Sequence, residues 1–201
     1  MRWSRPVWWM KNGATASRFL RDRRAATAVE FAVIVPLALL LLIGEYTLTD
    51  AMSTQRKVTI TAHTIADLVA RQSSVDATLM SEILNASAQI VSPYNMANTT
   101  VVVAELTTDG TGNTTVTWSQ AVNGAALTQG SPFTLPDSVK QAVLSEQGTP
   151  PVPVSLIYAS ASFRYTPVLK SNLFGPMVFN STYYENPRTI GCIPYAAPSC
   201  S

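Results

Sequence analysis

Histidine and cysteine are nearly absent from this sequence. Its 201 residues include one histidine, His63, and two cysteines, Cys192 and Cys200. A catalytic triad or a tetrahedral zinc site needs several such side chains close together. The sequence also has no phosphate-binding loop, dinucleotide fingerprint or nucleophile elbow. We therefore expect a protein that is not an enzyme and that has no cofactor and no metal site, with His63 on a helix surface.

Charge is missing from one long stretch near the N-terminus. Residues 25–44 contain a single charged side chain, Glu30. As a helix that rises about 1.5 Å per residue, this stretch matches a hydrocarbon core about 30 Å thick. Residues 26–44 are therefore predicted to form a transmembrane helix. Pro36 lies inside it and would remove one backbone hydrogen bond, which kinks or loosens the helix.

The chain before this stretch is strongly basic. Seven basic residues and one acidic residue precede residue 25, a net charge of +6, whereas the rest of the chain carries seven basic and eleven acidic residues, a net −4. Basic residues beside an apolar span stay in the cytoplasm. Residues 1–25 are thus predicted to be a cytoplasmic leader, and the chain from residue 45 onward lies outside. This charge flanks a membrane span, so nucleic acid is not an expected partner.

A removable secretory signal is the alternative for the apolar run. The basic segment before the run and the length of the run both fit such a signal. The residues after it, 45–50, contain no clean small-x-small cleavage site, which disfavours cleavage by signal peptidase.

The residues around this span also resemble those of a known family. They contain three consecutive patterns, Arg23-Arg24-Ala25-Ala26, Ala28-Val29-Glu30-Phe31-Ala32, and Pro36 followed by a Leu-rich run to Ile43. Together these resemble the TadE/TadG-like proteins of the tight-adherence (Flp) branch of bacterial type IV pili. The resemblance continues, with less specific motifs, to residues 163–167 and 186–188.

The resemblance implies a minor pilin or pseudopilin. In type IV pilin-like proteins, a prepilin peptidase cuts before the apolar segment and leaves glutamate as the fifth residue of the mature chain. A cut between Ala25 and Ala26 would make Glu30 the fifth residue and Phe31 the sixth. The family usually has glycine before the cut, where this chain has Ala25, so processing stays open. The implied partners are the inner membrane, other pilins or pseudopilins, platform proteins of the pilus machine and the prepilin peptidase.

Glu30 has two interpretations. A carboxylate inside a membrane span is costly unless it is paired, so it is a functional candidate. The resemblance implies that it pairs with the amine of a neighbouring subunit and so sets the register of assembly. Alternatively, it extends toward the cytoplasmic headgroups without a partner.

The rest of the chain predicts an α+β fold of the pilin type. Helical spacing of apolar residues continues through residue 71, and a capping signal at residues 73–76 precedes a second helix. Alternating β-rich segments then predict an antiparallel sheet, with residues 107–113 as a hairpin turn. The expected strands are 100–106, 114–120, 154–165 and 177–184, with a short helix at 137–145 that Asp137 caps. The expected organisation is a stem and second helix over 45–92 and an exported, periplasmic α+β head over 93–201.

The two cysteines are the last chemical feature. An exported domain lies in a compartment where disulfides persist, which favours a Cys192–Cys200 pair, and two separate thiols on a frayed tail are the alternative. The sequence thus predicts a pilus-assembly component that acts through protein contacts. An uncut, single-pass membrane anchor with a scaffold or ligand-binding domain outside the cytoplasm is the other hypothesis.

Overall fold

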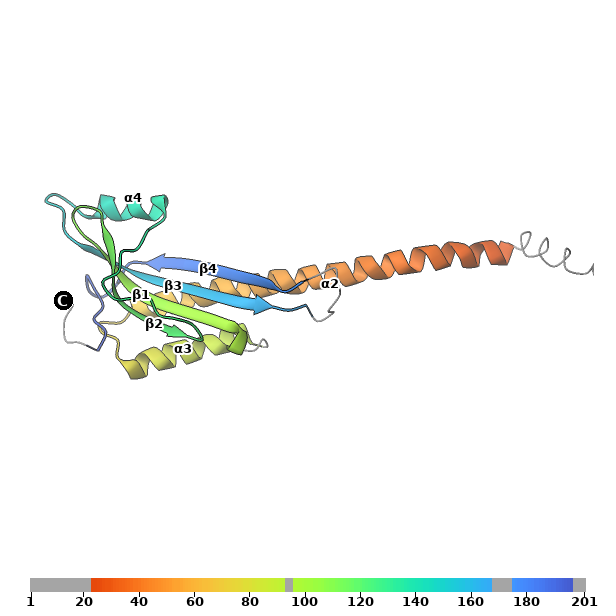
Figure 1. Ribbon diagram of the computed structural model, residues 1–201, viewed down its shortest axis with the longest axis horizontal. Helices are drawn as coiled ribbons and strands as arrows, with labels where there is room; N and C mark the ends of the chain where they lie inside the picture. The colour runs from red at the N-terminus through yellow and green to blue at the C-terminus, as the bar shows by residue number, and fades with distance from the viewer. Residues whose placement is uncertain (1–22, 93–95, 168–174, 197–201) are drawn as a thin grey trace, which may run out of the picture. The chain divides into compact units, whose positions relative to one another are not determined.

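The computed structural model describes residues 23–92, 96–167 and 175–196. The chain divides into two compact units, Met1–Thr49 and Asp50–Ser201, and we call the second the head unit. The fold is α+β, with one long N-terminal helix and a four-stranded antiparallel sheet accompanied by shorter helices (Figure 1). This confirms the predicted fold class.

Helix α2, Arg23–Ala70, is 48 residues long and agrees with the helix predicted over residues 26–71. Its part in the head unit is amphipathic. Val58, Ile65 and Val69 are spaced by seven and four residues and are buried, as expected for one face of a helix. The hydroxyls of Thr54 and Thr61 on this buried side donate to the carbonyls four residues earlier, at 2.8 and 2.9 Å. Each hydroxyl is thereby satisfied inside its own helix.

Helix α3, Ala77–Val91, begins at the predicted capping signal. Asp76 is the N-cap, and its carboxylate accepts a hydrogen bond from the backbone N–H of Leu79 at 2.7 Å. Such a bond satisfies one of the free N–H groups in the first turn.

The sheet has the strand order β2-β1-β3-β4, and all neighbours are antiparallel. Its strands are β1 (Thr99–Thr108), β2 (Thr114–Val122), β3 (Val154–Tyr165) and β4 (Met177–Glu185). Strands β1 and β2 form the predicted hairpin. The pairing of Glu105 with Trp118 and of Leu106 with Val116 leaves one extra residue in β2, which is a β-bulge.

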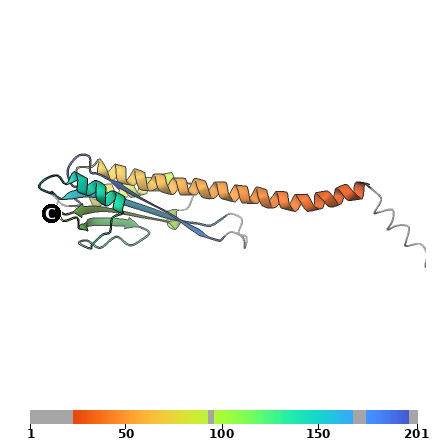
Figure 2. The ribbon, with the colours of Figure 1, turned by 90° about the horizontal axis from the view of Figure 1, so that it is seen from above.

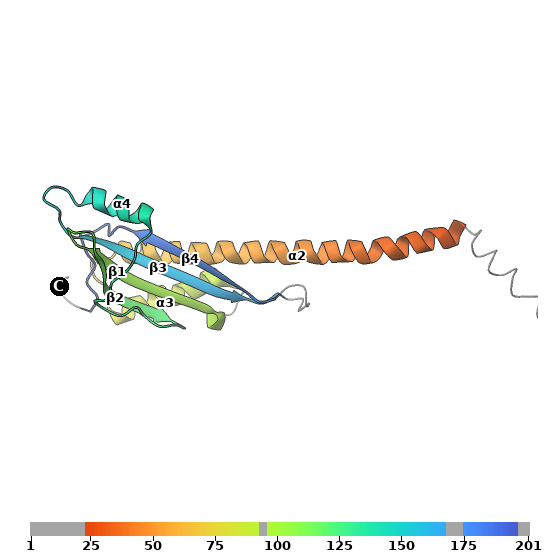
Figure 3. The same ribbon diagram turned by 45° about the horizontal axis from the view of Figure 1, so that its top comes forward.

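The head unit packs in three layers. Helices α2 and α3 cover one face of the sheet, where Val101 and Val103 of β1 join their core (Figure 2). Helix α4, Asp137–Glu146, covers part of the other face over Ala104 and Leu106 (Figure 3). Alternate residues of β1 thus serve two cores, as the pleat of a strand requires.

The prediction that Asp137 caps α4 is wrong. Pro136, not Asp137, is the N-cap, and no side chain caps the helix there. Asp137 is the first helical residue, where its negative charge still stabilises the positive end of the helix dipole.

Candidate functional site

The N-terminal part of α2 presents apolar side chains to its surroundings. Phe31 is 68% exposed and Leu41 is 67% exposed. The most apolar 18-residue window of the helix has no buried residues. An exposed apolar surface that extends over so many consecutive residues marks contact with a membrane or with another protein. By length and composition, α2 can cross a membrane once.

Glu30 lies within this exposed apolar part, and Phe31 follows it. Ala25 and Ala26 both lie in the helix, near its start at Arg23. Because α2 is helical here, residues 26 and 30 are one turn apart on the same side. An amine created at Ala26 would therefore lie near the carboxylate of Glu30.

Pro36 lies inside α2, and the helix continues on both sides of it. Proline has no N–H, so the carbonyl of Ala32 lacks its usual partner four residues later. The kink or loosening predicted at Pro36 stays a prediction.

Two hydrogen bonds join the part of α2 at the start of the head unit to the ends of β3 and α3. The Tyr165 hydroxyl donates to Asp50 Oδ2 at 2.6 Å, and Tyr165 itself is buried. On the same helix, Lys57 Nζ donates to the carbonyl of Ser92, just after α3, at 2.5 Å. A cation at the negative end of a helix is favourable. These two bonds hold the start of the head part of α2 against β3 and α3.

The other end of α2 is held by the segment that follows β4. The backbone N–H of Arg188 donates to the carbonyl of Ala70 at 2.8 Å, and its guanidinium bridges Asp67 and Glu185, both at 2.8 Å. Asp67 also pairs with Arg71, whose hydrogen bond is the main reason that the pKa of Asp67 is lowered. The two guanidinium groups are exposed to solvent and the two carboxylates are half-buried, so each pair contributes little on its own.

The C-terminal segment is part of the core. The Ile193 side chain is 0% exposed and packs in the core formed with α2 and α3. Its backbone N–H donates to Glu105 Oε1 at 2.7 Å, and its carbonyl accepts from Trp118 Nε1 at 2.7 Å. Tyr195 continues this attachment by forming a parallel bridge with Val75. The frayed tail, which was the alternative to the predicted disulfide, is therefore wrong for the described residues up to 196.

Glu105 is the most unusual polar residue of the head unit. It lies on the central strand β1 with 0% exposure, and its Oε2 has no hydrogen-bond partner. The Ser155 hydroxyl and the Trp118 indole lie nearby, but the indole N–H donates to Ile193 instead. Burial raises the pKa of Glu105, because a charged carboxylate loses its hydration there. Sequence reasoning did not single out Glu105, because nothing in the sequence distinguishes it from a surface glutamate.

Cys192 is disulfide-bonded. The predicted partner, Cys200, lies outside the described residues, and the Cys192–Cys200 pairing stays a prediction.

His63 and Asp109 each contact neighbouring residues of the head unit. His63 is exposed on α2, as expected, and its ring meets that of Tyr183 edge-on at 4.4 Å. In the hairpin turn, Asp109 Oδ1 accepts from the backbone N–H groups of Thr111 and Asn113, both at 2.9 Å. Hydrogen bonds led by that from the Thr111 hydroxyl lower the pKa of Asp109. Among the described residues, no group of three or more His, Cys, Asp or Glu could hold a metal ion.

Gln147 is a second residue that the sequence did not reveal. It is buried, and its Nε2 donates to the carbonyls of Thr108 and Asp109 at 3.4 and 2.5 Å. It therefore fastens the end of α4 to the β1–β2 hairpin.

The comparisons with known proteins add no family to these observations. No protein-family model matches the chain, and comparison with curated proteins and with solved structures finds no significant similarity.

Proposed function

We propose that this chain is a minor pilin or pseudopilin of a tight-adherence (Flp) pilus. It would be anchored in the bacterial inner membrane by α2, with its N-terminus in the cytoplasm and its head unit in the periplasm. The observation that carries the proposal is the exposed, apolar N-terminal part of α2, which contains the pilin-like pattern around Glu30. The basic residues before it support the orientation.

The position of Glu30 supports an assembly role for this helix. An unpaired carboxylate in a bilayer is expensive, and a buried one is stabilised by a cationic partner. Processing before Ala26 supplies such a cation on the same side of the helix. A neighbouring subunit or a platform protein supplies one if the chain is uncut.

An uncut, single-pass anchor with a scaffold or ligand-binding head is the second candidate. It is favoured by Ala25, since the resembling family usually has glycine before the cut. N-terminal sequencing of the membrane-extracted protein separates the two. An N-terminus at Ala26 means processing by a prepilin peptidase, and an intact leader means a permanent anchor.

The assembly role is tested by replacing Glu30 with Ala or with Gln. Both variants lose the only charge in the span, so insertion becomes easier. If Glu30 pairs inside a helix assembly, its partner is left uncompensated at a cost of about 3–5 kcal/mol. We expect normal amounts of protein in the membrane and strongly reduced piliation, counted by electron microscopy.

The matched control is Glu45→Gln, which removes a carboxylate just beyond the apolar run and should leave piliation unchanged. Normal piliation with both Glu30 variants would refute the pairing and leave a plain membrane anchor.

A further inference from the structure

The two edges of the sheet differ. The outer edge of β2 is covered by residues 130–133, through hydrogen bonds such as Val116 N–H to the carbonyl of Ser131 at 3.0 Å and Phe133 N–H to that of Thr114 at 2.8 Å. Strand β4 forms the other edge. In the part of the chain that the structure describes, no backbone hydrogen bond outside the ladder with β3 reaches β4. The Gln55 side chain of α2 approaches β4, with Nε2 3.5 Å from the carbonyl of Asn180.

Strand β4 also lacks the features that usually protect an edge. Its nine residues include no lysine and no proline, and Glu185 at its end is its one charged residue. Val178 is 61% exposed, and Asn180 and Thr182 are exposed as well. A long edge with free N–H and C=O groups and few charges is suited to pairing with another strand.

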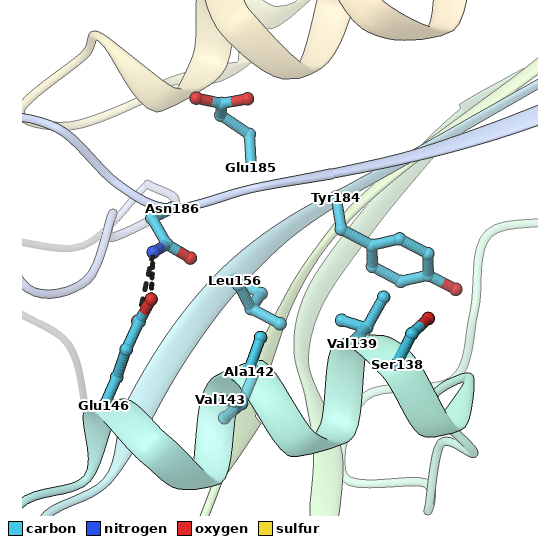
Figure 4. Close-up of a pocket in the computed structure, with 9 residues that line it drawn as sticks. All are labelled: Ser138, Val139, Ala142, Val143, Glu146, Leu156, Tyr184, Glu185 and Asn186. Atoms are coloured by element: carbon cyan, nitrogen blue, oxygen red, sulfur yellow. Dashed lines mark hydrogen bonds between the residues drawn. The ribbon is translucent and has the colours of Figure 1, made fainter.

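A cavity of about 420 Å³ lies beside the end of this edge, between α4 and β4. Val139 and Ala142 of α4 and Leu156 of β3 form its apolar part, and the Tyr184 ring lies against Val139 and Ser138 (Figure 4). Glu185 points away from α4. The cavity therefore combines an apolar wall from a helix with the terminal residues of the edge strand β4.

Glu146 is the charged group at one end of the cavity. Asn186 Nδ2 donates to its Oε1 and Oε2 at 3.1 and 3.0 Å, which orients the carboxylate at the rim (Figure 4). A carboxylate has about four acceptor positions. Asn186 occupies two of them, one on each oxygen, and the others are available to a cation.

We propose that the β4 edge and this cavity bind an extended segment of another polypeptide by strand addition. The backbone of the segment pairs with β4, while side chains at alternate positions face α4. One of these is an apolar residue that enters the cavity, and a lysine or arginine near it pairs with Glu146. The proposal rests on the head unit and holds whether or not the chain belongs to a pilus.

Fluorescence anisotropy with the full chain in nanodiscs tests this inference. The probes are labelled ten-residue peptides that alternate threonine with leucine, valine or phenylalanine. Half of them also contain a lysine or arginine, and the other half contain no basic residue. Each is paired with a version that is N-methylated along one edge, which removes the backbone donors. We expect saturable binding by unmodified peptides and a loss of about tenfold or more, equal to about 1.4 kcal/mol, on N-methylation. Hydrogen exchange of the β4 amides should slow on binding.

Two variants locate the site, each with a control. Ala142→Trp fills the cavity and should weaken binding about tenfold or more, whereas Gln141→Trp, on the same helix but outside the cavity lining, should not. Glu146→Gln should weaken only the peptides with a basic residue, and Glu82→Gln on α3 should weaken none.

Three results would overturn the proposal. They are equal binding by N-methylated and unmodified peptides, unchanged binding to Ala142→Trp, and no saturable binding by any peptide of the set up to about 1 mM, the weakest affinity that such a site would be expected to have.

Discussion

Glu105 shows how a single residue can oppose the stability of the unit that contains it. Its carboxylate accepts one strong hydrogen bond from Ile193 and leaves Oε2 unpartnered in the core. An unsatisfied buried polar group usually costs about 1–3 kcal/mol, and more when it is charged. The residue therefore holds the C-terminal segment at the expense of an unsatisfied polar atom in the core.

The raised pKa of Glu105 determines how its contribution to the stability of the head unit changes with pH. The folded-state pKa of Glu105 is raised above that of the unfolded chain. Its contribution to stability is therefore fully present below the unfolded pKa and is lost as pH rises through the folded pKa. Asp67 and Asp109 have lowered pKa values and oppose this trend, because their contributions are lost as pH falls.

Glu105→Gln isolates the effect of Glu105. The amide oxygen can still accept from Ile193, and the amide can donate to Ser155 without a buried charge. We expect the variant to be more stable than the wild type at pH 7 by about 1–3 kcal/mol. The difference between their thermal unfolding curves should shrink as the pH is lowered. A variant that is less stable at pH 7 would show that the charge is compensated.

The C-terminal segment, residues 192–196, is held to the rest of the head unit mainly by packing and hydrogen bonds. The Ile193 side chain is buried in the core, and its backbone N–H and carbonyl are hydrogen-bonded to Glu105 and Trp118. Tyr195 adds a β-bridge to Val75. The disulfide at Cys192 closes only a short loop if its partner is Cys200, and short loops gain least from cross-linking. Packing should therefore contribute more to stability than the disulfide.

Ile193→Ala and Cys192→Ser compare these two contributions. Truncating a fully buried isoleucine costs about 2–5 kcal/mol, and we expect the serine variant to lose less. Chemical denaturation of both under the same conditions measures the difference. A larger loss for Cys192→Ser would show that the cross-link, not the core, holds the segment. Thiol labelling of the unfolded, unreduced wild type should find no free cysteine.

The described chain consists of the apolar N-terminal part of α2 and the head unit, which has its own core. Residues 50–201 contain the three described core clusters, the sheet and the bonds at both ends of the head part of α2. We expect this fragment to be soluble and to unfold cooperatively, as measured by calorimetry. Aggregation of the fragment would indicate that the unit needs the preceding helix.

Membrane orientation is tested on the complete chain. A reporter that works only outside the cytoplasm, fused after Ser201, should be active, because the basic flank predicts a cytoplasmic N-terminus. Activity of a cytoplasm-specific reporter at the same position would contradict the proposed topology.

The secondary structure was largely predictable from local patterns. The apolar run, the capping Asp76 and the hairpin turn are signals within a few residues of each other, and α2, α3, β1 and β2 begin near them. The exposed apolar part of α2 could likewise be predicted, because an uninterrupted hydrophobic run has no polar face to present to water.

The core that a side chain joins could not be predicted where it depends on contacts with segments distant in the sequence. Val116 and Trp118 are two residues apart and would share one face of a regular strand. The bulge in β2 instead sends Val116 to the core under α4 and Trp118 to the core under α2 and α3. Trp118 can then bond to Ile193, 75 residues away.

By itself the sequence determined a single apolar helix, the α+β class and the pattern around Glu30, because each depends on neighbouring residues along the chain. Only the tertiary structure decided that Glu105 is buried, that the C-terminal segment completes the core and that the edge strand β4 lies beside a cavity. These features arise where segments far apart in sequence meet, and the local propensities of the residues do not encode which segments pack together.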